Sequence, residues 1–132
     1  MAWVVDTSVL LDIFSADPAF AQSSAECLSQ HLAEGLLVCP VTYVEMAPAF
    51  KGDSVKQDQF FAVVGVEWRE PWTLRDTQAA HRLWAEHIKR KRAGHTGKRP
   101  TADVLIEGFV HRFQGIITRN PGHFTSVPVV IP

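Results

Sequence analysis

Three acidic residues stand where short apolar stretches give way to segments that can begin a helix. Asp6 follows the apolar run 2–5, Glu45 follows the run 36–39, and Asp103 lies at the start of a late helical segment. Carboxylates gathered in one pocket repel each other, so such a cluster is stable only if protons or a cation neutralise it. Oxygen ligands of this kind suit Mg²⁺ or Mn²⁺, which also bind substrate phosphate and can activate a water molecule. These residues could therefore support metal-assisted cleavage of a phosphate ester.

Local patterns leave a second explanation open for two of these acids. Asp6 could simply cap the next helix by accepting a backbone N–H, and Thr7 or Ser8 could do the same. Glu45 is expected in the first turn of its helix, where Thr42-x-x-Glu45 matches a capping box. On these stretches alone, the capping and the chemical interpretations stand side by side.

The surrounding elements decide whether the acids can meet. Apolar runs predict strands at 2–5, 36–39, 115–118 and 127–131, with a short edge strand at 66–68. Helical spacing and capping residues predict helices over 18–34, 54–64 and 74–92, and a further helix capped by Thr101. This alternation predicts an α/β fold, a three-layer α/β/α sandwich with a mainly parallel central sheet. Because ligands bind where the carboxyl ends of such strands converge, we expect all three acids at that edge.

The bulk composition limits the class of protein. A chain of 132 residues, 46% of them hydrophobic, predicts a single globular domain over 1–132. We expect no membrane segment, because no run approaches the roughly twenty apolar residues that a spanning helix needs. Cys27 and Cys39 lack metal-ligand or CxxC spacing, which predicts reduced thiols in the core and favours a cytoplasmic protein. The six histidines show no such spacing either, so we expect no metal role for them.

Charge is distributed unevenly along the chain although the net charge is only −1. Residues 1–70 carry ten acids and three bases, whereas residues 71–132 carry four acids and ten bases. Six of those ten bases fall between Lys89 and Arg99. Such a segment could hold a phosphate backbone or an acidic partner. It could also be a solvated helix end, whose cations suit the negative end of the helix dipole.

Four stretches in order along the chain carry a family resemblance: Val4-Val5-Asp6-Thr7-Ser8-Val9-Leu10-Leu11, Val44-Glu45, Ala102-Asp103-Val104-Leu105-Ile106 and Ile117-Thr118-Arg119-Asn120-x-x-x-Phe124. Together they resemble the motifs of PIN-domain ribonucleases, in particular the VapC-like toxins of toxin–antitoxin pairs. The resemblance covers essentially the whole chain. It implies a PIN-like fold and a Mg²⁺- or Mn²⁺-dependent endoribonuclease that cleaves RNA. It also implies a homodimer and inhibition by a small antitoxin protein.

The resemblance assigns roles position by position. Asp6, Glu45 and Asp103 match the metal-binding acids of the family. Ser8, or Thr7, matches the hydroxyl beside the first acid, and Thr118 the hydroxyl after the late strand. The sequence departs from the family at Asn120, where many members have a further acid. Asparagine can ligate through its carbonyl oxygen but supplies no charge, so we expect a weaker second metal site.

Charged residues near these motifs have two possible roles each, at the site or at the surface. Arg119 could contact phosphate, but an arginine in a turn is more simply a surface residue. Glu107 and Asp12 could touch a metal-bound water, yet both are expected to be surface charges.

Two other function classes are compatible with parts of the pattern. A phosphotransferase or phosphatase could use Asp6 as a nucleophile, although no second acid follows two positions later. A PIN-fold module that binds RNA or protein with weak or no nuclease turnover would be consistent with Asn120.

Overall fold

Short parallel strands form the central sheet, in the order β2-β1-β3-β4. β1 (Trp3–Val5) lies between β2 (Leu36–Leu37) and β3 (Gly115–Ile117), and β4 (Val129–Val130) pairs with β3. The structure, a computed structural model, describes residues 1–94 and 100–132. The first strand of the chain is therefore an inner strand, and its carboxyl end lies inside the fold.

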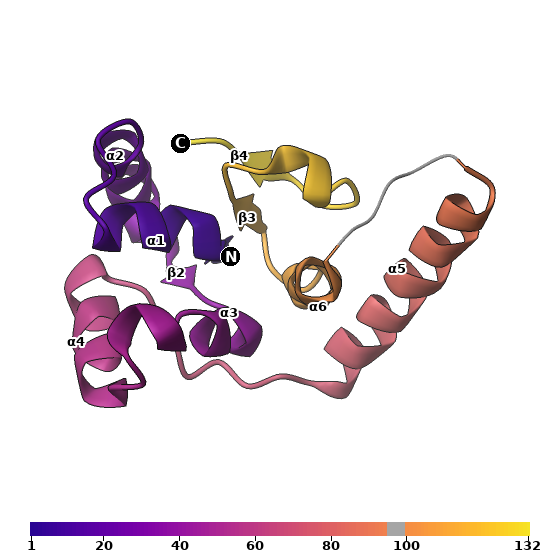
Figure 1. Cartoon of the computed structure of the whole chain (residues 1–132), viewed down its shortest axis with the longest axis horizontal. Helices are drawn as coiled ribbons and strands as arrows, with labels where there is room; N and C mark the ends of the chain where they lie inside the picture. Colours follow the sequence, from indigo (N-terminus) through magenta and orange to yellow (C-terminus); the bar gives the residue numbers. More distant parts are fainter. Residues whose placement is uncertain (95–99) are drawn as a thin grey trace.

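Helices connect and cover these strands (Figure 1). In chain order they are α1 (Thr7–Phe14), α2 (Ala21–His31), η1 (Leu32–Glu34), α3 (Pro40–Glu45), η2 (Ala47–Phe50), α4 (Ser54–Val64), α5 (Leu74–Arg92), α6 (Thr101–Val110) and η3 (Pro121–His123). None of the helices in the described part of the chain is both long and apolar enough to cross a membrane.

Two hydrophobic cores lie on opposite faces of the sheet. Successive side chains of a strand point to opposite faces, so Val5 joins the core formed with α1, α2 and α4, and Val4 joins the core formed with α6. α5 packs against the outside of α6 (Figure 1). The two helices approach closely at Gly108, where a Cβ atom would lie 2.8 Å from the backbone nitrogen of Ala80. The predicted three-layer α/β/α sandwich is confirmed.

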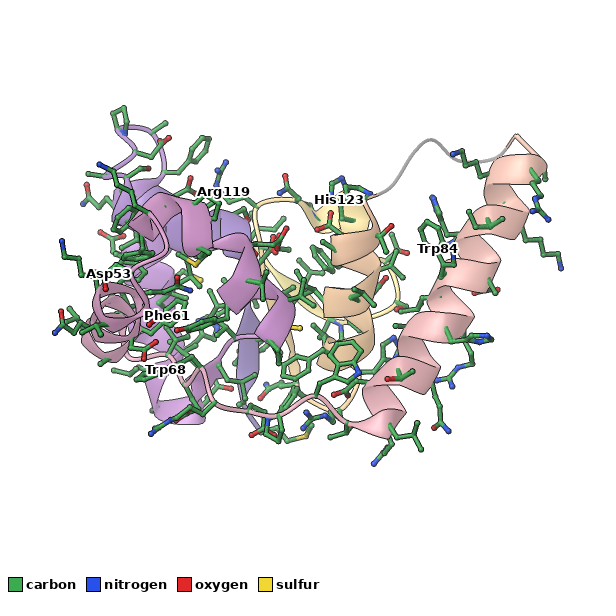
Figure 2. All side chains as sticks on the ribbon, turned by 60° about the horizontal axis from the view of Figure 1, so that its bottom comes forward. Asp53, Phe61, Trp68, Trp84, Arg119 and His123 are labelled. Carbon is green, nitrogen blue, oxygen red and sulfur yellow. The ribbon has the colours of Figure 1, made fainter. Side chains whose placement is uncertain are left out.

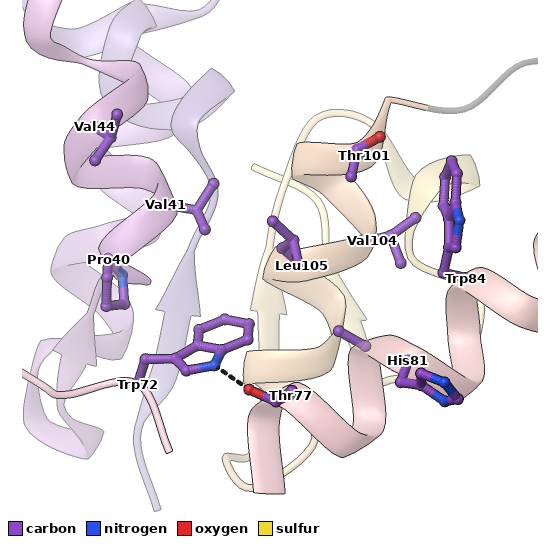
Figure 3. Close-up of a pocket in the computed structure, with 11 residues that line it drawn as sticks. Pro40, Val41, Val44, Trp72, Thr77, His81, Trp84, Thr101, Val104 and Leu105 are labelled. Atoms are coloured by element: carbon purple, nitrogen blue, oxygen red, sulfur yellow. Dashed lines mark hydrogen bonds between the residues drawn. The ribbon is translucent and has the colours of Figure 1, made fainter. Parts of the chain in front are cut away.

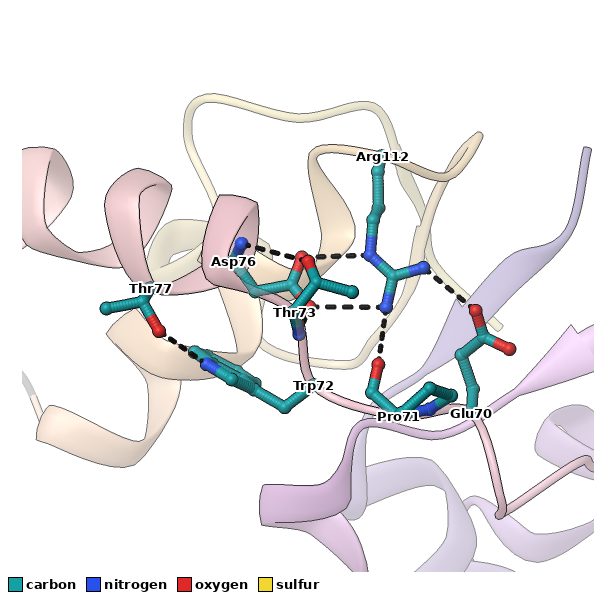
Figure 4. A network of polar contacts seen from close by, with 7 residues as sticks. All are labelled: Glu70, Pro71, Trp72, Thr73, Asp76, Thr77 and Arg112. Carbon is teal, nitrogen blue, oxygen red and sulfur yellow. Dashed lines mark hydrogen bonds and ion pairs between the residues drawn. The ribbon is translucent and has the colours of Figure 1, made fainter.

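The first turn of α5 is fixed to the body of the protein through Arg112 (Figure 4). Its guanidinium donates to both carboxylate oxygens of Asp76, at 2.9 and 3.2 Å, to Glu70 at 2.8 Å and to the carbonyl oxygen of Pro71 at 2.7 Å. Asp76 is only 1% exposed and also completes the capping box with Thr73. This ion pair therefore holds the start of the longest helix against the chain that precedes it.

Some local predictions were wrong. The expected edge strand at 66–68 is reduced to an isolated bridge between Glu67 and Leu37. The helix expected over 18–34 is α2, which begins only at Ala21 and passes into a 3₁₀ turn after His31. Thr101 is the first residue of α6 rather than its cap, because Pro100 occupies the N-cap position.

Candidate acidic active site

Asp6 is the most tightly held of the three predicted acids. It lies at the carboxyl end of β1 and is the N-cap of α1, where Oδ1 accepts the Thr7 N–H at 2.8 Å. Its other oxygen, Oδ2, accepts from the Ser8 hydroxyl at 2.9 Å and from the Thr118 hydroxyl at 2.7 Å. The residue is 4% exposed. Both interpretations of Asp6 therefore hold for its geometry: it caps a helix and lies buried among hydroxyl donors at the end of an inner strand.

Glu45 reaches the same edge from α3, but not in the way that the sequence predicted. The helix begins at Pro40, whose missing N–H and fixed φ suit the first helical position, and Cys39 is the N-cap. Glu45 is therefore the last residue of α3 and not a first-turn capping residue. Its Oε1 instead accepts from the Thr7 hydroxyl at 2.7 Å, which ties α3 to the start of α1.

Asp103 lies in the first turn of α6 and contacts a residue that sequence reasoning did not select. Its Oδ2 hydrogen-bonds with Nδ1 of His123, at the end of η3. The side chain of Asp103 is 17% exposed, and that of His123 is 44% exposed. The position of His123 in the turn after β3 was the available signal, because that turn leaves the sheet at the edge where the acids were expected.

The three acids influence each other electrostatically. Burial raises the pKa of Asp6, hydrogen bonds from Thr118 and Ser8 oppose the rise, and the charge of Asp103 adds to it. Burial likewise raises the pKa of Glu45, the Thr7 hydroxyl opposes the rise, and the charges of Asp103 and Asp6 add to it. Asp103 therefore lies close enough to Asp6 and Glu45 for its charge to raise the pKa values of both, as expected for a cluster at one edge.

The donor chemistry of this cluster fits a divalent cation. All three side chains offer carboxylate oxygens, and a cation would relieve the repulsion that raises the pKa values of Asp6 and Glu45. Within residues 1–94 and 100–132, however, no three Asp, Glu, His or Cys side chains are already grouped as a metal site. The residues that could hold Mg²⁺ or Mn²⁺ thus share an edge without forming a finished coordination shell.

The turn after β3 links two of the acids. Thr118 donates to Asp6 and accepts the backbone N–H of Asn120 at 3.0 Å. Asn120 in turn accepts the His123 N–H through its carbonyl oxygen, also at 3.0 Å. The residue predicted as a substitute for a fourth acid therefore joins this network through its backbone, and it is exposed.

Two acids that were expected on the surface are buried. Asp12 is 5% exposed and forms a two-point ion pair with Arg119, which also stacks on the ring of Phe20 at 4.0 Å. Glu107 is fully buried and accepts the N–H and the hydroxyl of Ser126 at 2.9 and 2.8 Å. The prediction was wrong because both partners come from distant parts of the chain. Arg119 likewise serves to join the end of β3 to α1, and it lies along the same side of the molecule as His123 in Figure 2.

An apolar groove lies beside the acidic edge, between α3, α5 and α6 (Figure 3). Its volume is about 640 Å³, and its walls include Val41, Val44, Trp72, Trp84 and Leu105. Val44 precedes Glu45 in the sequence and is 71% exposed, and Trp84 is 38% exposed. The predicted basic segment begins further along α5, where Lys89, Arg90, Lys91 and Arg92 form an exposed last turn. Lys98 and Arg99, the rest of that segment, lie outside the described residues.

Comparison with known proteins addresses the fold. No family model and no curated protein matches the sequence. Among solved structures, the chain is similar to a chain of VapBC2 from Rickettsia felis, determined bound to a DNA fragment from their promoter. The match has a TM-score of 0.74 and 13% sequence identity, and it covers 99% of this chain and 98% of the other. At this identity the likeness concerns the fold alone, which the two chains share over nearly their whole lengths.

Proposed function

We propose that this protein is a Mg²⁺- or Mn²⁺-dependent endoribonuclease and the toxin of a toxin–antitoxin pair. The observation that carries the proposal is the gathering of three acids at the carboxyl edge of the sheet: Thr7 donates to both Asp6 and Glu45, and the turn 118–123 contacts both Asp6 and Asp103. Such an edge is where α/β folds bind ligands, and a VapC-like fold supplies the same arrangement of strands.

Each residue of the site has a defined task in this proposal. Asp6, Asp103 and Glu45 would hold the metal, which when bound would activate a water and offset negative charge on the phosphate. Ser8 and Thr118 hold the Asp6 carboxylate in one orientation. Because both hydroxyls donate to the same oxygen, they also support its ionised form, which is the form that binds cations.

RNA is the proposed substrate because cations for its backbone are available on the same chain. The four consecutive basic residues of the last turn of α5 are exposed and carry like charge. Contacts of this kind release counterions and give affinity without sequence preference. We therefore propose that this turn binds phosphates outside the cleavage point and that RNA affinity falls as salt concentration rises.

A cleavage assay tests the proposal directly. The purified protein is incubated with single-stranded RNA and Mn²⁺, beside Asp6→Asn, Asp103→Asn and the control Glu26→Gln, which changes an exposed acid on α2. We expect wild type and the control to cleave, and both aspartate variants to lose cleavage while they keep the fold by circular dichroism. Undiminished cleavage by either aspartate variant, or cleavage that persists in chelator, would refute the assignment.

The same assay separates the alternatives. RNA binding without any turnover in Mn²⁺ would identify a binding module instead of a nuclease. A phospho-aspartate trapped at Asp6 would identify a phosphotransferase. The structure makes nucleophilic attack by Asp6 unfavourable, because three donors already engage its two oxygens and weaken them as nucleophiles.

A small antitoxin is the proposed protein partner. The similar solved structure is of a VapBC2 complex, and the acidic edge, where Glu45 is exposed, is complementary to a lysine or arginine from a bound protein. Co-expression with the product of an adjacent short reading frame should give a stable complex without RNase activity. A complex that leaves the acidic edge open and active would contradict this inhibition.

We also propose that the protein is a homodimer through the groove of Figure 3. The groove exposes a large apolar surface on α3 and α5, and burial of Val44 and Trp84 against a second copy would stabilise the pair. Trp84→Glu should then yield a monomer by light scattering at concentrations where wild type is dimeric. The control Val63→Glu, an exposed residue of α4, should leave the dimer intact.

A further inference from the structure

His123 contacts the acidic cluster through a hydrogen bond with Asp103. Its Nδ1 lies within hydrogen-bonding distance of Asp103 Oδ2, although the two residues are 20 positions apart. An ionised carboxylate only accepts hydrogen bonds, so Nδ1 carries the proton and donates it. The imidazole therefore fixes one oxygen of an acid that the proposed function assigns to the metal.

The start of α6 explains why Asp103 turns toward this partner. Asp103 is the third residue of the helix, the position from which an acid commonly accepts the backbone N–H of the cap residue. Asp76 does this at the start of α5, where it accepts from the N–H of Thr73 at 2.9 Å. In α6 the cap residue is Pro100, which has no N–H to donate. The ordinary structural role of an acid at this position is thus closed to Asp103.

The backbone that carries His123 is held at both ends. Thr118 accepts the Asn120 N–H while it donates to Asp6, and Asn120 accepts the His123 N–H. Phe124, the next residue, is 1% exposed and packs in the core on the α6 face. The turn 118–123 therefore contacts Asp6 at its beginning and Asp103 at its end, and it sets the separation of the two acids.

We propose that His123 is a positioning residue of the active site, which orients Asp103 for metal binding through the Nδ1 hydrogen bond. The inference rests on the proposed function. It adds a histidine to a site that otherwise consists of acids and hydroxyl groups. Outer partners of metal ligands typically change metal affinity or activity by 10- to 100-fold when they are removed, and we expect an effect in this range.

Asparagine and glutamine at position 123 separate the two nitrogens of the imidazole. An Asn side chain can place its amide nitrogen where Nδ1 lies, one bond from Cγ, whereas Gln places it nearer the position of Nε2. His123→Ala removes both ring nitrogens. The matched control is His111→Asn, which changes an exposed histidine that contacts Ser126 at 2.9 Å rather than one of the three acids of the site.

Mn²⁺ affinity by titration calorimetry, without RNA, is the first measurement. We expect His123→Ala to weaken Mn²⁺ binding about tenfold or more, His123→Asn to stay within about threefold of wild type, and His111→Asn to be unchanged. The second measurement is RNA cleavage against Mn²⁺ concentration, where His123→Ala should need more metal for half-maximal rate but approach the wild-type maximum. Metal-free melting curves show that each variant is folded.

The outcomes separate this inference from the proposed function. If His123→Ala has the Mn²⁺ affinity and the metal dependence of wild type, the role of His123 is overturned. Cleavage by wild type would still support the nuclease proposal in that case. Rescue by His123→Gln but not by His123→Asn would also overturn it, because Nε2 would then be the important atom. If wild type binds Mn²⁺ but cleaves no RNA, the calorimetric series still decides the role of His123, and the nuclease proposal alone fails.

Discussion

The ion pair at the start of α5 allows a quantitative prediction about stability. Replacement of Arg112 by Met removes its bonds to Asp76, Glu70 and the Pro71 carbonyl. Methionine keeps an unbranched apolar stem over the rings of Phe109 and Phe113, which the guanidinium carbon approaches to 4.9 and 4.5 Å. The substitution therefore tests the ion pair rather than the packing beneath it.

The size of the loss follows from the burial of Asp76. Removal of one partner of a buried ion pair typically costs about 3–5 kcal/mol, because the other charge stays buried without compensation. Asp76 keeps one donor, the Thr73 N–H at 2.9 Å, so we expect the lower end, about 3 kcal/mol. A loss of this size is a large part of the roughly 5–15 kcal/mol that stabilises a typical domain.

Urea denaturation at a fixed pH measures this free energy of unfolding. The control Arg82→Met changes an exposed arginine of α5 and should alter stability by no more than about 0.5 kcal/mol. Asp76→Asn combined with Arg112→Met should cost clearly less than the sum of the two single changes, since the second change removes the charge that the first left unpaired. Equal losses for Arg112→Met and Arg82→Met, or strict additivity, would refute the reasoning.

Three further predictions concern other parts of the chain. Because burial and Asp103 raise the pKa of Asp6, the metal-free protein should gain stability as pH falls from above that raised pKa toward the ordinary aspartate value of 3.8. Asp6→Asn, which keeps a good N-cap, should raise the melting temperature at pH 8 and weaken this gain; an unchanged pH profile would contradict it. Gly108→Ala should lower the free energy of unfolding by about 1–2 kcal/mol, since the cost of overpacking against Ala80 exceeds the helix-propensity gain, whereas Gly122→Ala has open space and should be near neutral. Burial raises the pKa of Cys39 to about 12, so its thiol should resist alkylation at pH 8 until the protein is unfolded.

The architecture could be predicted from the sequence because it depends on strong, repeated signals. Short Val- and Ile-rich runs marked the strands, and the helices between them required parallel pairing. The burial of both sheet faces then placed the ends of β1 and β3 together, where Thr118 meets Asp6 across 112 positions of sequence. The hydroxyl beside the first acid was likewise predicted, since Ser8 donates to Asp6.

The same local pattern succeeded at one helix and failed at another. Thr73-x-x-Asp76 forms a capping box, but Thr42-x-x-Glu45 does not, because Pro40 starts α3 earlier and moves Glu45 to its last turn. A capping pattern states only that two residues could pair, and a proline upstream decides where the helix begins. Glu45 is therefore not a helix-capping residue, which favours its interpretation as a residue of the acidic site.

Contacts between distant segments account for the remaining differences. Asp12 and Glu107 are charged residues on helices, so the sequence favours solvent exposure. Their burial depends on Arg119 and Ser126, which follow β3 and are unrelated to them by any spacing rule. His123 was missed for the same reason, since its contact with Asp103 exists only once α6 and η3 pack on the same edge.

The inner position of β1 has a consequence for how the protein is made. A ribosome produces Asp6 more than a hundred residues before β3 and the Thr118 hydroxyl that completes its environment. Closure of such a long loop must precede the native pairing, so the acidic edge forms only after β3 has emerged. A chain that stops before β3 lacks the Thr118 hydroxyl and the completed environment of Asp6, so such a chain should not show the proposed nuclease activity.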